Sequence, residues 1–420
     1  MKIRMWKMKI MFAVMKKKLS FSIGIWFLCS LWSLVQGQII SNLKAHVTYL
    51  ASDSLHGRMT GSADEKLAAD YIIKQFIGAG ITNANGNFKT KKYLQPFHYA
   101  PKLDSIITKV NGNNVVAFID NKAANTIILG AHFDHLGWGL PAHSTYRGEP
   151  AIHNGADDNA SGVATIIELA RQLKNSSFKN NNYLFIAFSG EELGLYGSKW
   201  FVEHPSLDLT KVDYMLNFDM VGRIDSNKLV VSGVGTSPSW NEAMKRITSS
   251  FHIKTTESGV GPSDHTSFYL KQIPVLHFFS GQHKDYHKPS DDESKINYKG
   301  MEDVVVYVES LIGELNAKPK ISFTKTKEDN NENAPKFTVT LGVMPDYTFE
   351  GEGMRIDAVT EGKPASKAGL QEGDVVQQLG EIKVTDMMSY MKALSQFKKG
   401  DVSKVKVKRG TEVLEKPVQF

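Results

Sequence analysis

Histidine and carboxylate side chains gather at five places in the central part of this sequence. These places are Ala131-His132-Phe133-Asp134-His135, Asp157-Asp158-Asn159, Glu191-Glu192, Asp219 and Asp285-Tyr286-His287. Imidazole and carboxylate ligands without sulfur suit zinc, with manganese or cobalt as alternatives. One carboxylate can bridge two such ions, and the pair can activate water and stabilise a developing oxyanion. The adjacent residues Glu191 and Glu192 could then supply a ligand and a general base.

Each of these groups alone has an ordinary structural explanation. Asp158 or Asn159 could simply cap a helix, and a pair of glutamates usually lies on a solvated surface. A single histidine after a strand is usually a core or surface residue. The combination is more informative, because unpaired acids at the ends of apolar strands are costly unless something compensates their charge. A pair of metal ions would compensate all of them.

Short apolar stretches precede most of these groups and predict buried strands. The predicted strands are Thr126–Ala131, Tyr183–Phe188, Tyr214–Phe218, Leu229–Val231 and Pro274–Phe279. Residues with helical spacing predict helices at Ala63–Phe76, Val163–Leu173, Leu193–Glu203 and Met301–Leu315. This alternation indicates an α/β fold with a largely parallel mixed sheet flanked by helices. Ligands bind at the carboxyl ends of strands in such sheets, so we expect the five groups to share one site.

These motifs resemble those of the co-catalytic zinc aminopeptidases, metallopeptidase family twenty-eight, which also includes the glutamate carboxypeptidases. The resemblance runs from about Asp53 to Leu315. It includes an amino-terminal segment, Asp53-Ser54-Leu55-His56-Gly57-Arg58, followed by Thr60-Gly61-Ser62. The resemblance implies a fold of the zinc exopeptidase type and two zinc ions (Zn2+) per chain.

The resemblance also assigns a role to each polar residue of the five groups. The implied metal ligands are His132, Asp158, Glu192, Asp219 and His287. Asp158 would bridge the two ions, with His132 and Asp219 on one and Glu192 and His287 on the other. The peptide bond between Asp158 and Asn159 is expected to be cis.

Three further residues have implied catalytic roles. Glu191 would be the general base that takes a proton from water and passes it to the leaving amine. Tyr286 would donate its hydroxyl to the oxyanion, and Asp134 would orient the imidazole of His132. Several other histidines lie near these motifs, and spacing alone leaves them open as ligands or assisting groups: His135, His153, His265 and His283.

The charge distribution argues against nucleic-acid binding. The whole chain has a formal net charge of +6, but residues 1–38 contain seven basic and no acidic residues, which leaves −1 for the remainder. Such a nearly neutral protein offers no electrostatic basis for binding a phosphate backbone. Hydrophobic residues make up 41% of the chain and charged residues 22%. This is the composition of a globular protein and excludes a disordered chain, a collagen-like fibre and a multi-span membrane protein.

Residues 1–38 have the pattern of a secretory signal peptide. The basic stretch Lys16–Lys18 precedes an apolar run from Phe21 to Val35, which Gly37 follows. That run of about 15 residues is shorter than the roughly 20 that span a bilayer. The single cysteine, Cys29, lies inside it, so a mature chain would contain neither disulfides nor cysteine-bound zinc. We expect a secreted or periplasmic protein without a stable membrane span after signal removal.

The composition changes after Leu315 and predicts a second domain. We expect a signal peptide at 1–38, a zinc peptidase domain at 39–316, a linker at 317–335 and a small β-rich domain at 336–420. Predicted strands of the last domain are Lys336–Leu341, Arg355–Val359 and Val402–Arg409, and predicted helices lie near Ala365–Ala368 and at Met387–Gln396.

This carboxy-terminal block resembles a PDZ domain of the bacterial protease-associated type. Leu341-Gly342-Val343 stands where that family has its carboxylate-binding loop, and Pro364–Leu370 followed by Glu372–Val376 is its other signature. The resemblance implies binding of peptide C-termini by strand addition. Pro345 departs from the pattern because proline has no N–H to donate. A packing role at the rim of the active site is therefore the alternative.

The sequence as a whole predicts a secreted zinc-dependent exopeptidase acting on peptide substrates, in first place an aminopeptidase. Alternatives are a carboxypeptidase or dipeptidase of the same family, a glutaminyl cyclase with one zinc ion, and a non-catalytic envelope protein that binds peptides. The complete set of five ligands argues against the one-metal cyclase. The presence of both Glu191 and Glu192 argues against the non-catalytic protein.

Overall fold

The computed structural model describes residues 37–420 apart from short gaps. These gaps are residues 85, 87–88, 100–109, 140–142, 147, 225–226, 327–338, 346–348, 350, 360–361 and 386. The predicted signal peptide therefore lies almost entirely outside the described residues. Within the described part of the chain, no helix is both long enough and apolar enough to cross a membrane.

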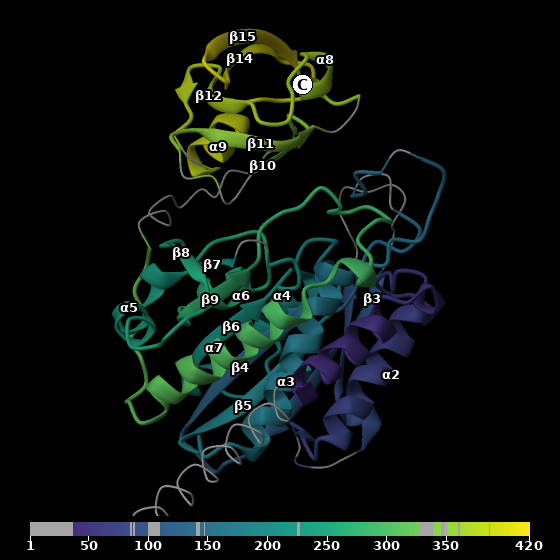
Figure 1. Cartoon of the computed structure of the whole chain (residues 1–420), viewed down its shortest axis with the longest axis vertical. Helices are drawn as coiled ribbons and strands as arrows, with labels where there is room; N and C mark the ends of the chain where they lie inside the picture. Colours follow the sequence, from purple (N-terminus) through teal and green to yellow (C-terminus); the bar gives the residue numbers. More distant parts are fainter. Residues whose placement is uncertain are drawn as a thin grey trace, which may run out of the picture.

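The larger unit is built on a mixed sheet (Figure 1). Its strands are β1 (Thr82–Asn83), β2 (Leu94–Tyr99), β3 (Val110–Ile119), β4 (Asn125–His132), β5 (Asn181–Phe188), β6 (Val212–Phe218), β7 (Lys228–Ser232), β8 (His252–Thr256) and β9 (Val275–Phe279). Their order is β1-β3-β5-β4-β6-β9-β7-β8, and β2 pairs with β3. The central strands β5, β4, β6 and β9 are parallel neighbours, whereas β3 and β7 flank them in antiparallel orientation. The predicted mixed α/β sheet is confirmed, with its parallel part at the centre.

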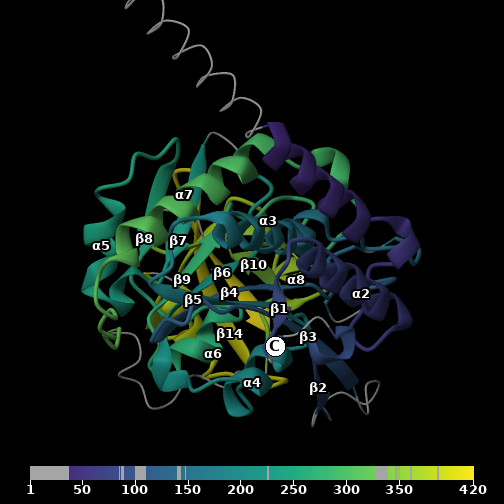
Figure 2. The ribbon, with the colours of Figure 1, turned by 90° about the horizontal axis from the view of Figure 1, so that it is seen from below.

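Helices cover both faces of this sheet. They are α2 (Ala63–Gly78), α3 (Gly162–Asn175), α4 (Tyr196–Glu203), α5 (Pro238–Met244), α6 (His265–Tyr269) and α7 (Tyr298–Asn316), and residues 37–50 are also helical. Figure 2 shows α2, α3 and α7 on one side of the sheet and α4 and α6 on the other. The predicted helix Leu193–Glu203 begins only at Tyr196, because Leu195 has a left-handed backbone with φ of 63°.

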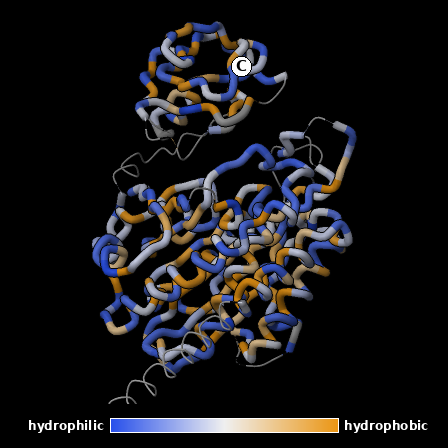
Figure 3. Tube along the Cα trace, viewed as in Figure 1, coloured by the Kyte–Doolittle hydropathy of each residue, from blue (hydrophilic) through white to orange (hydrophobic). Residues whose placement is uncertain are grey.

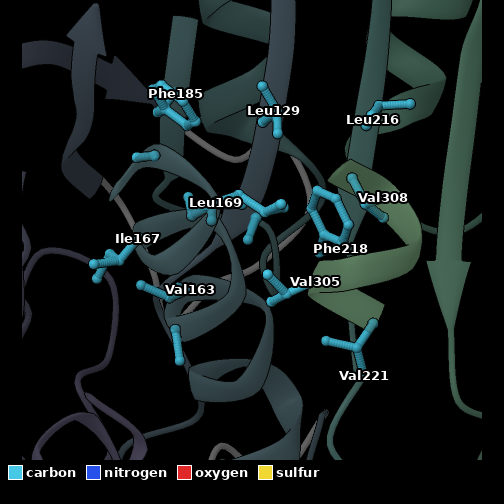
Figure 4. Packing of buried hydrophobic residues seen from close by; sticks show 14 of the residues in the cluster. Leu129, Val163, Ile167, Leu169, Phe185, Leu216, Phe218, Val221, Val305 and Val308 are labelled. Atoms are coloured by element: carbon cyan, nitrogen blue, oxygen red, sulfur yellow. The ribbon is translucent and has the colours of Figure 1, made fainter. Parts of the chain in front are cut away.

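Side chains along the central strands point alternately to the two faces of the sheet, and each face has its own hydrophobic core. Ile127, Leu129 and Ala131 of β4 pack into the core under α3 and α7, while Ile128 between them faces the core under α4 and α6. Figure 4 shows residues of the first core, in which side chains of α3 and α7 meet strand residues such as Leu129. All of these strand residues are buried, which is why the strands are continuously apolar in the sequence.

The carboxy-terminal unit has its own antiparallel sheet and its own core. Its strands are β10 (Val343–Pro345), β11 (Met354–Val359), β12 (Val375–Leu379), β13 (Ile382–Lys383), β14 (Val402–Arg409) and β15 (Glu412–Gln419), and its helices are α8 (Pro364–Lys367) and α9 (Met387–Leu394). Buried residues such as Ile356, Leu379 and Val405 form a cluster separate from the two cores of the larger unit. Figure 3 shows hydrophobic and hydrophilic positions interspersed along the trace of both units.

One predicted strand of this unit is wrong in its described part. Residues 336–338 of the predicted strand Lys336–Leu341 lie outside the described residues, and residues 339–341 are not in a strand. The strand begins after Gly342, whose φ of 77° turns the chain. Leu341 is buried, and its carbonyl accepts a hydrogen bond of 2.8 Å from the amide of Ala365. The apolar residue thus serves the core of the unit without being part of its sheet.

The beginning of the predicted linker lies against the larger unit. The amide of Ile321 donates to Oδ1 of Asp213 over 2.8 Å, and the amide of Thr324 donates to the carbonyl of Thr236 over 2.8 Å. Ile321 is also buried in the core of that unit. Residues 327–335 of the predicted linker fall within an undescribed stretch.

Candidate metal centre

Parallel strand order brings four of the five sequence groups to one edge of the sheet. His132 is the last residue of β4, Asp219 directly follows β6, and the glutamate pair follows β5 after a two-residue turn. His287 lies in the loop after β9. Asp158 comes from the turn that leads into α3. The structure thus brings all five predicted ligands together from sequence positions more than 150 residues apart.

The bridging candidate Asp158 faces a histidine on each side. Its Oδ1 atom lies 3.2 Å from Nε2 of His132, and its Oδ2 atom lies 3.2 Å from Nε2 of His287. Nε2 of His132 is also 3.3 Å from Oδ1 of Asp219. Nε2 of His287 is 3.1 Å from Oε2 of Glu192. Two groups of three candidate ligands therefore share one aspartate.

These separations fit zinc. Two ligand atoms bound at about 2.0–2.1 Å with a tetrahedral angle between them lie roughly 3.3 Å apart. The four contacts of the two histidine Nε2 atoms fall between 3.1 and 3.3 Å. The donor atoms are nitrogen and carboxylate oxygen without sulfur, which suits zinc and other first-row metals. The donor atoms around Asp158 therefore suit divalent metal ions.

His135 is a third histidine beside this centre. Its Nδ1 atom lies 2.7 Å from Oε1 of Glu192 and 4.0 Å from Oδ2 of Asp158, so these three residues also form a group that could hold an ion. A separation of 2.7 Å is a hydrogen-bond distance and is short for two ligands of one zinc ion. In the sequence, the feature that points to His135 is its position directly after Asp134 in the same motif.

Asp134, which was predicted to orient the imidazole of His132, contacts two parts of the centre. Its Oδ1 atom lies 3.8 Å from Nδ1 of His132 and accepts a hydrogen bond of 3.2 Å from the amide of Glu191. Its Oδ2 atom accepts the hydroxyl of Thr60 over 2.7 Å. The backbone carbonyl of Asp134 lies closer to Nδ1 of His132, at 3.3 Å. Asp134 therefore contacts the imidazole through both its backbone and its side chain.

The loop that carries Asp158 is held by residues that the sequence analysis missed. The carboxylate of Asp291 accepts the amide N–H groups of Asp157 and Asp158 over 3.0–3.1 Å. The side chain of Asn159 donates to the carbonyl of Phe218 over 2.9 Å, directly before Asp219. The peptide bond between Asp158 and Asn159 is cis, which confirms that expectation. Asp291 follows His287 by four residues, which is the one signal that could have identified it.

The two adjacent glutamates have opposite electrostatic surroundings. Burial raises the pKa of Glu191 well above its usual value, although the nearby His132 lowers it. Burial also favours the neutral form of Glu192, but His287 and His135 hold the pKa of that carboxyl below its usual range. Oε2 of Glu191 lies 4.0 Å from Nε2 of His132, farther than the four contacts of 3.1–3.3 Å that the His132 and His287 Nε2 atoms make. The surroundings thus shift the pKa values of two adjacent glutamates in opposite directions, as in enzymes that use a pair of carboxylates as acid and base.

Tyr286 lies against the second histidine of the centre. Its ring stacks on that of His287 with centroids 3.8 Å apart and an interplanar angle of 19°. Burial and the carboxylates of Asp158 and Glu192 raise its pKa well above 10. Its phenol therefore stays protonated and can donate a hydrogen bond near neutral pH.

The remaining competing histidines have other partners. His265 stacks on His277 with ring centroids 4.4 Å apart, and both are buried beside the centre. Nε2 of His153 lies 2.7 Å from the hydroxyl of Ser144, and Nδ1 donates to the backbone carbonyl of Ala151 over 2.9 Å. His283 contacts Asp157 over 3.1 Å. Within the described parts of the chain, none of these histidines belongs to a group of metal-ligand spacing.

Comparison with known proteins identifies both units. Residues 114–312 match the model described as peptidase family M28, and residues 321–419 match that of the PDZ domain. The chain is similar to Leupeptin-inactivating enzyme 1 of Streptomyces exfoliatus, with 27% identity over 264 residues. It is also similar to Aminopeptidase YwaD of Bacillus subtilis, with 30% identity over 186 residues.

These matches cover only parts of the relatives. They span 61% of this chain and 52% of the Streptomyces protein, and 41% and 40% for the Bacillus protein. Among solved structures, a Zn-dependent exopeptidase from Parabacteroides distasonis has a TM-score of 0.53 at 17% identity, covering 65% of this chain and 97% of that one. At that identity the likeness concerns the fold, and it confirms the predicted zinc exopeptidase type. The chain thus carries a domain of peptidase family M28 followed by a PDZ domain.

Proposed function

We propose that this protein is a secreted zinc-dependent exopeptidase, and specifically an aminopeptidase that removes N-terminal residues from peptides. Two zinc ions would be held by His132, Asp158 and Asp219 and by His287, Asp158 and Glu192. The observation that carries the proposal is the position of Asp158, whose two oxygens each lie 3.2 Å from a different histidine nitrogen. A carboxylate with ligand-spaced nitrogens on both sides is what a shared bridging ligand requires.

The other residues of the site have roles that fit their positions. When bound, the ions would polarise the scissile carbonyl and make water a better nucleophile at neutral pH. Glu191 lies 4.0 Å from His132 and belongs to neither ligand group, so its carboxylate is free to accept a proton and deliver it to the leaving amine. Tyr286 would donate its hydroxyl to the developing oxyanion. Asp134 would keep the imidazole of His132 in place.

Cleavage from the amino terminus, rather than from the carboxyl terminus, is supported by the family and by the name of the Bacillus relative. A carboxypeptidase or a dipeptidase of the same family is the alternative, since all would use the same metal centre. A glutaminyl cyclase with one zinc ion would not need two ligand groups that share an aspartate. A non-catalytic envelope peptide-binding protein would not need Glu191 beside the centre.

A panel of matched peptides separates these candidates. The purified chain, kept free of chelator, is assayed for metal content and for cleavage of a hexapeptide with free ends, with an acetylated amino terminus and with an amidated carboxyl terminus. The proposal expects two zinc ions per chain and cleavage that only the acetylated amino terminus prevents.

Other outcomes of that panel contradict the proposal in distinct ways. Loss of cleavage only with the amidated carboxyl terminus would indicate a carboxypeptidase. A dipeptide and a peptide with N-terminal glutamine complete the panel. Cleavage of the dipeptide alone would indicate a dipeptidase, and cyclisation of the glutamine would indicate the cyclase. A chain without zinc and without turnover would favour the peptide-binding protein. The secreted location is tested separately by sequencing the amino terminus of the exported chain, which should begin near residue 39.

A further inference from the structure

The segment Asp53–Glu65, which the proposed chemistry does not use, contains a completely buried arginine. The side chain of Arg58 is 0% exposed. Nε donates to the carbonyl of Phe133 over 2.7 Å, and Nη1 donates to the carbonyl of Leu50 over 3.0 Å. Nη1 also donates to the carbonyl of Asn154, and Nη2 donates to that of Gly155 over 2.7 Å. Four of its five N–H groups are thus bonded to backbone oxygen.

The partners of Arg58 flank two proposed zinc ligands. Phe133 directly follows His132, and Gly155 lies three residues before Asp158. A planar guanidinium directs its N–H groups at fixed angles. One side chain thus bonds both to the end of β4 and to the loop before α3. Because these two segments are far apart in the sequence, the guanidinium of Arg58 fixes the distance between them.

The backbone around Arg58 also pairs with the segment after β4. Met59 forms a β-bridge with His135, and the amide of Gly137 donates to the carbonyl of Gly57 over 3.1 Å. The approach is close at Gly57, where a Cβ atom would lie 2.4 Å from the carbonyl oxygen of His153. Thr60, three residues after Gly57, donates its hydroxyl to Asp134. The whole segment therefore lies against the loops that carry the candidate ligands.

The charge of Arg58 is compensated at longer range. Among the described residues, no carboxylate lies within ion-pair distance of its guanidinium. Burial lowers its pKa to about 10, and Asp158 and Asp134 are the carboxylates that oppose this shift most. It is therefore a cation at neutral pH. A buried cation without a direct partner is costly, and surrounding acids and carbonyl dipoles must offset that cost.

We propose that Arg58 is the positioning residue of the metal centre, which holds the His132 and Asp158 segments at zinc-ligand spacing and balances the excess negative charge of the site. This inference rests on the proposed function. Asp158, Asp134, Asp291 and Glu192 are the carboxylates that act electrostatically on the guanidinium. The guanidinium supplies a positive charge beside this acidic cluster. An ammonium group could supply that charge without reaching the same carbonyls.

The test compares zinc affinity in full-length variants, measured by competition with a chelator, together with the visible spectrum of the cobalt-loaded protein. Arg58→Lys keeps the charge and Arg58→Gln removes it. Both should bind zinc about 10–100-fold more weakly than the parent chain, the range for outer-layer partners of metal ligands. The cobalt spectrum of both should shift, because the ligand geometry changes. The matched control Arg171→Gln, which removes an arginine paired with Glu168 on α3, should change neither measurement.

Three outcomes decide the inference. Unchanged zinc affinity and cobalt spectrum in the two Arg58 variants would overturn it, while a parent chain without zinc would instead overturn the proposed function. Full recovery by Arg58→Lys would reduce the role to charge alone and reject positioning. If both variants fail to fold, Thr60→Val decides, since it removes only the hydroxyl bond to Asp134. Zinc affinity equal to the parent in that variant would contradict a positioning role for this segment.

Discussion

Nδ1 of His135 lies 2.7 Å from Oε1 of Glu192. The other carboxylate oxygen, Oε2, faces Nε2 of His287 at 3.1 Å. The two distances distinguish two kinds of contact, because 2.7 Å is typical of a charge-assisted hydrogen bond and 3.1 Å is near the separation of two ligands on one zinc ion. We infer that His135 orients Glu192 and that His287 binds the metal beside it.

Substitution of the two histidines separates these roles. His287→Ala should reduce the zinc content from two ions to one and abolish turnover, since a ligand is lost. His135→Ala should retain both ions but bind one of them about 10–100-fold more weakly. Zinc per chain after dialysis against a weak chelator is the measurement. The opposite pattern, with His135→Ala lacking one ion and His287→Ala retaining both, would exchange the two assignments.

Glu191→Gln tests the proposed general base. Because the side chain lies outside both ligand groups, the variant should retain two zinc ions. Turnover should fall by about 10²–10⁴-fold, the usual contribution of a positioned base. The exposed Glu242→Gln on α5 is the matched control and should behave like the parent chain. Full activity of Glu191→Gln would remove this residue from the mechanism.

Glu65 predicts a dependence of stability on pH. Burial raises its pKa to about 8, although hydrogen bonds from Ser189 and Gly61 oppose the shift. The unfolded chain has a glutamate pKa of about 4.3. Between these values the folded protein keeps a proton that the unfolded chain releases, so the free energy of unfolding falls as pH rises. This stabilisation is complete below about pH 4 and lost above about pH 8.

Glu65→Gln removes this titration while keeping the shape of the protonated side chain. The difference in unfolding free energy between variant and parent, measured by denaturant titration, should move in favour of the variant from pH 5 to pH 8. Glu242→Gln should show no such trend. A constant difference for Glu65→Gln across this range would mean that Glu65 is ionised in the folded protein.

The separate cores predict two independent unfolding events. Leu379→Ala leaves a cavity in the buried core of the PDZ unit and should destabilise that unit by about 2–5 kcal/mol. Calorimetry should show one transition moving to lower temperature, while zinc content and turnover stay unchanged. Val402→Ala is the control, because Val402 is 71% exposed. A shift of both transitions by Leu379→Ala would show that the two units unfold together.

The strands of the sheet centre could be predicted because both of their faces are buried. Such strands need apolar residues at every position, as in Tyr183–Phe188, and this pattern is visible in one sequence. The β2–β3 hairpin was not predicted. Strand β3 contains Asn111, Gly112, Asn113 and Asn114, which resemble a turn. Asn114 is nevertheless buried, because its side chain bonds to Gly197 and Gln95.

The sequence by itself determined the type of chemistry, since His132, Asp158, Glu192 and Asp219 stand in motifs at the ends of predictable strands. Tertiary structure alone decided which imidazoles face which oxygens and what holds them there. Arg58 donates hydrogen bonds to backbone carbonyls. Because every residue has a backbone carbonyl, the partners of Arg58 cannot be recognised in the sequence by their residue type. Chain folding selects those partners by bringing residue 58 against residues 133 and 155.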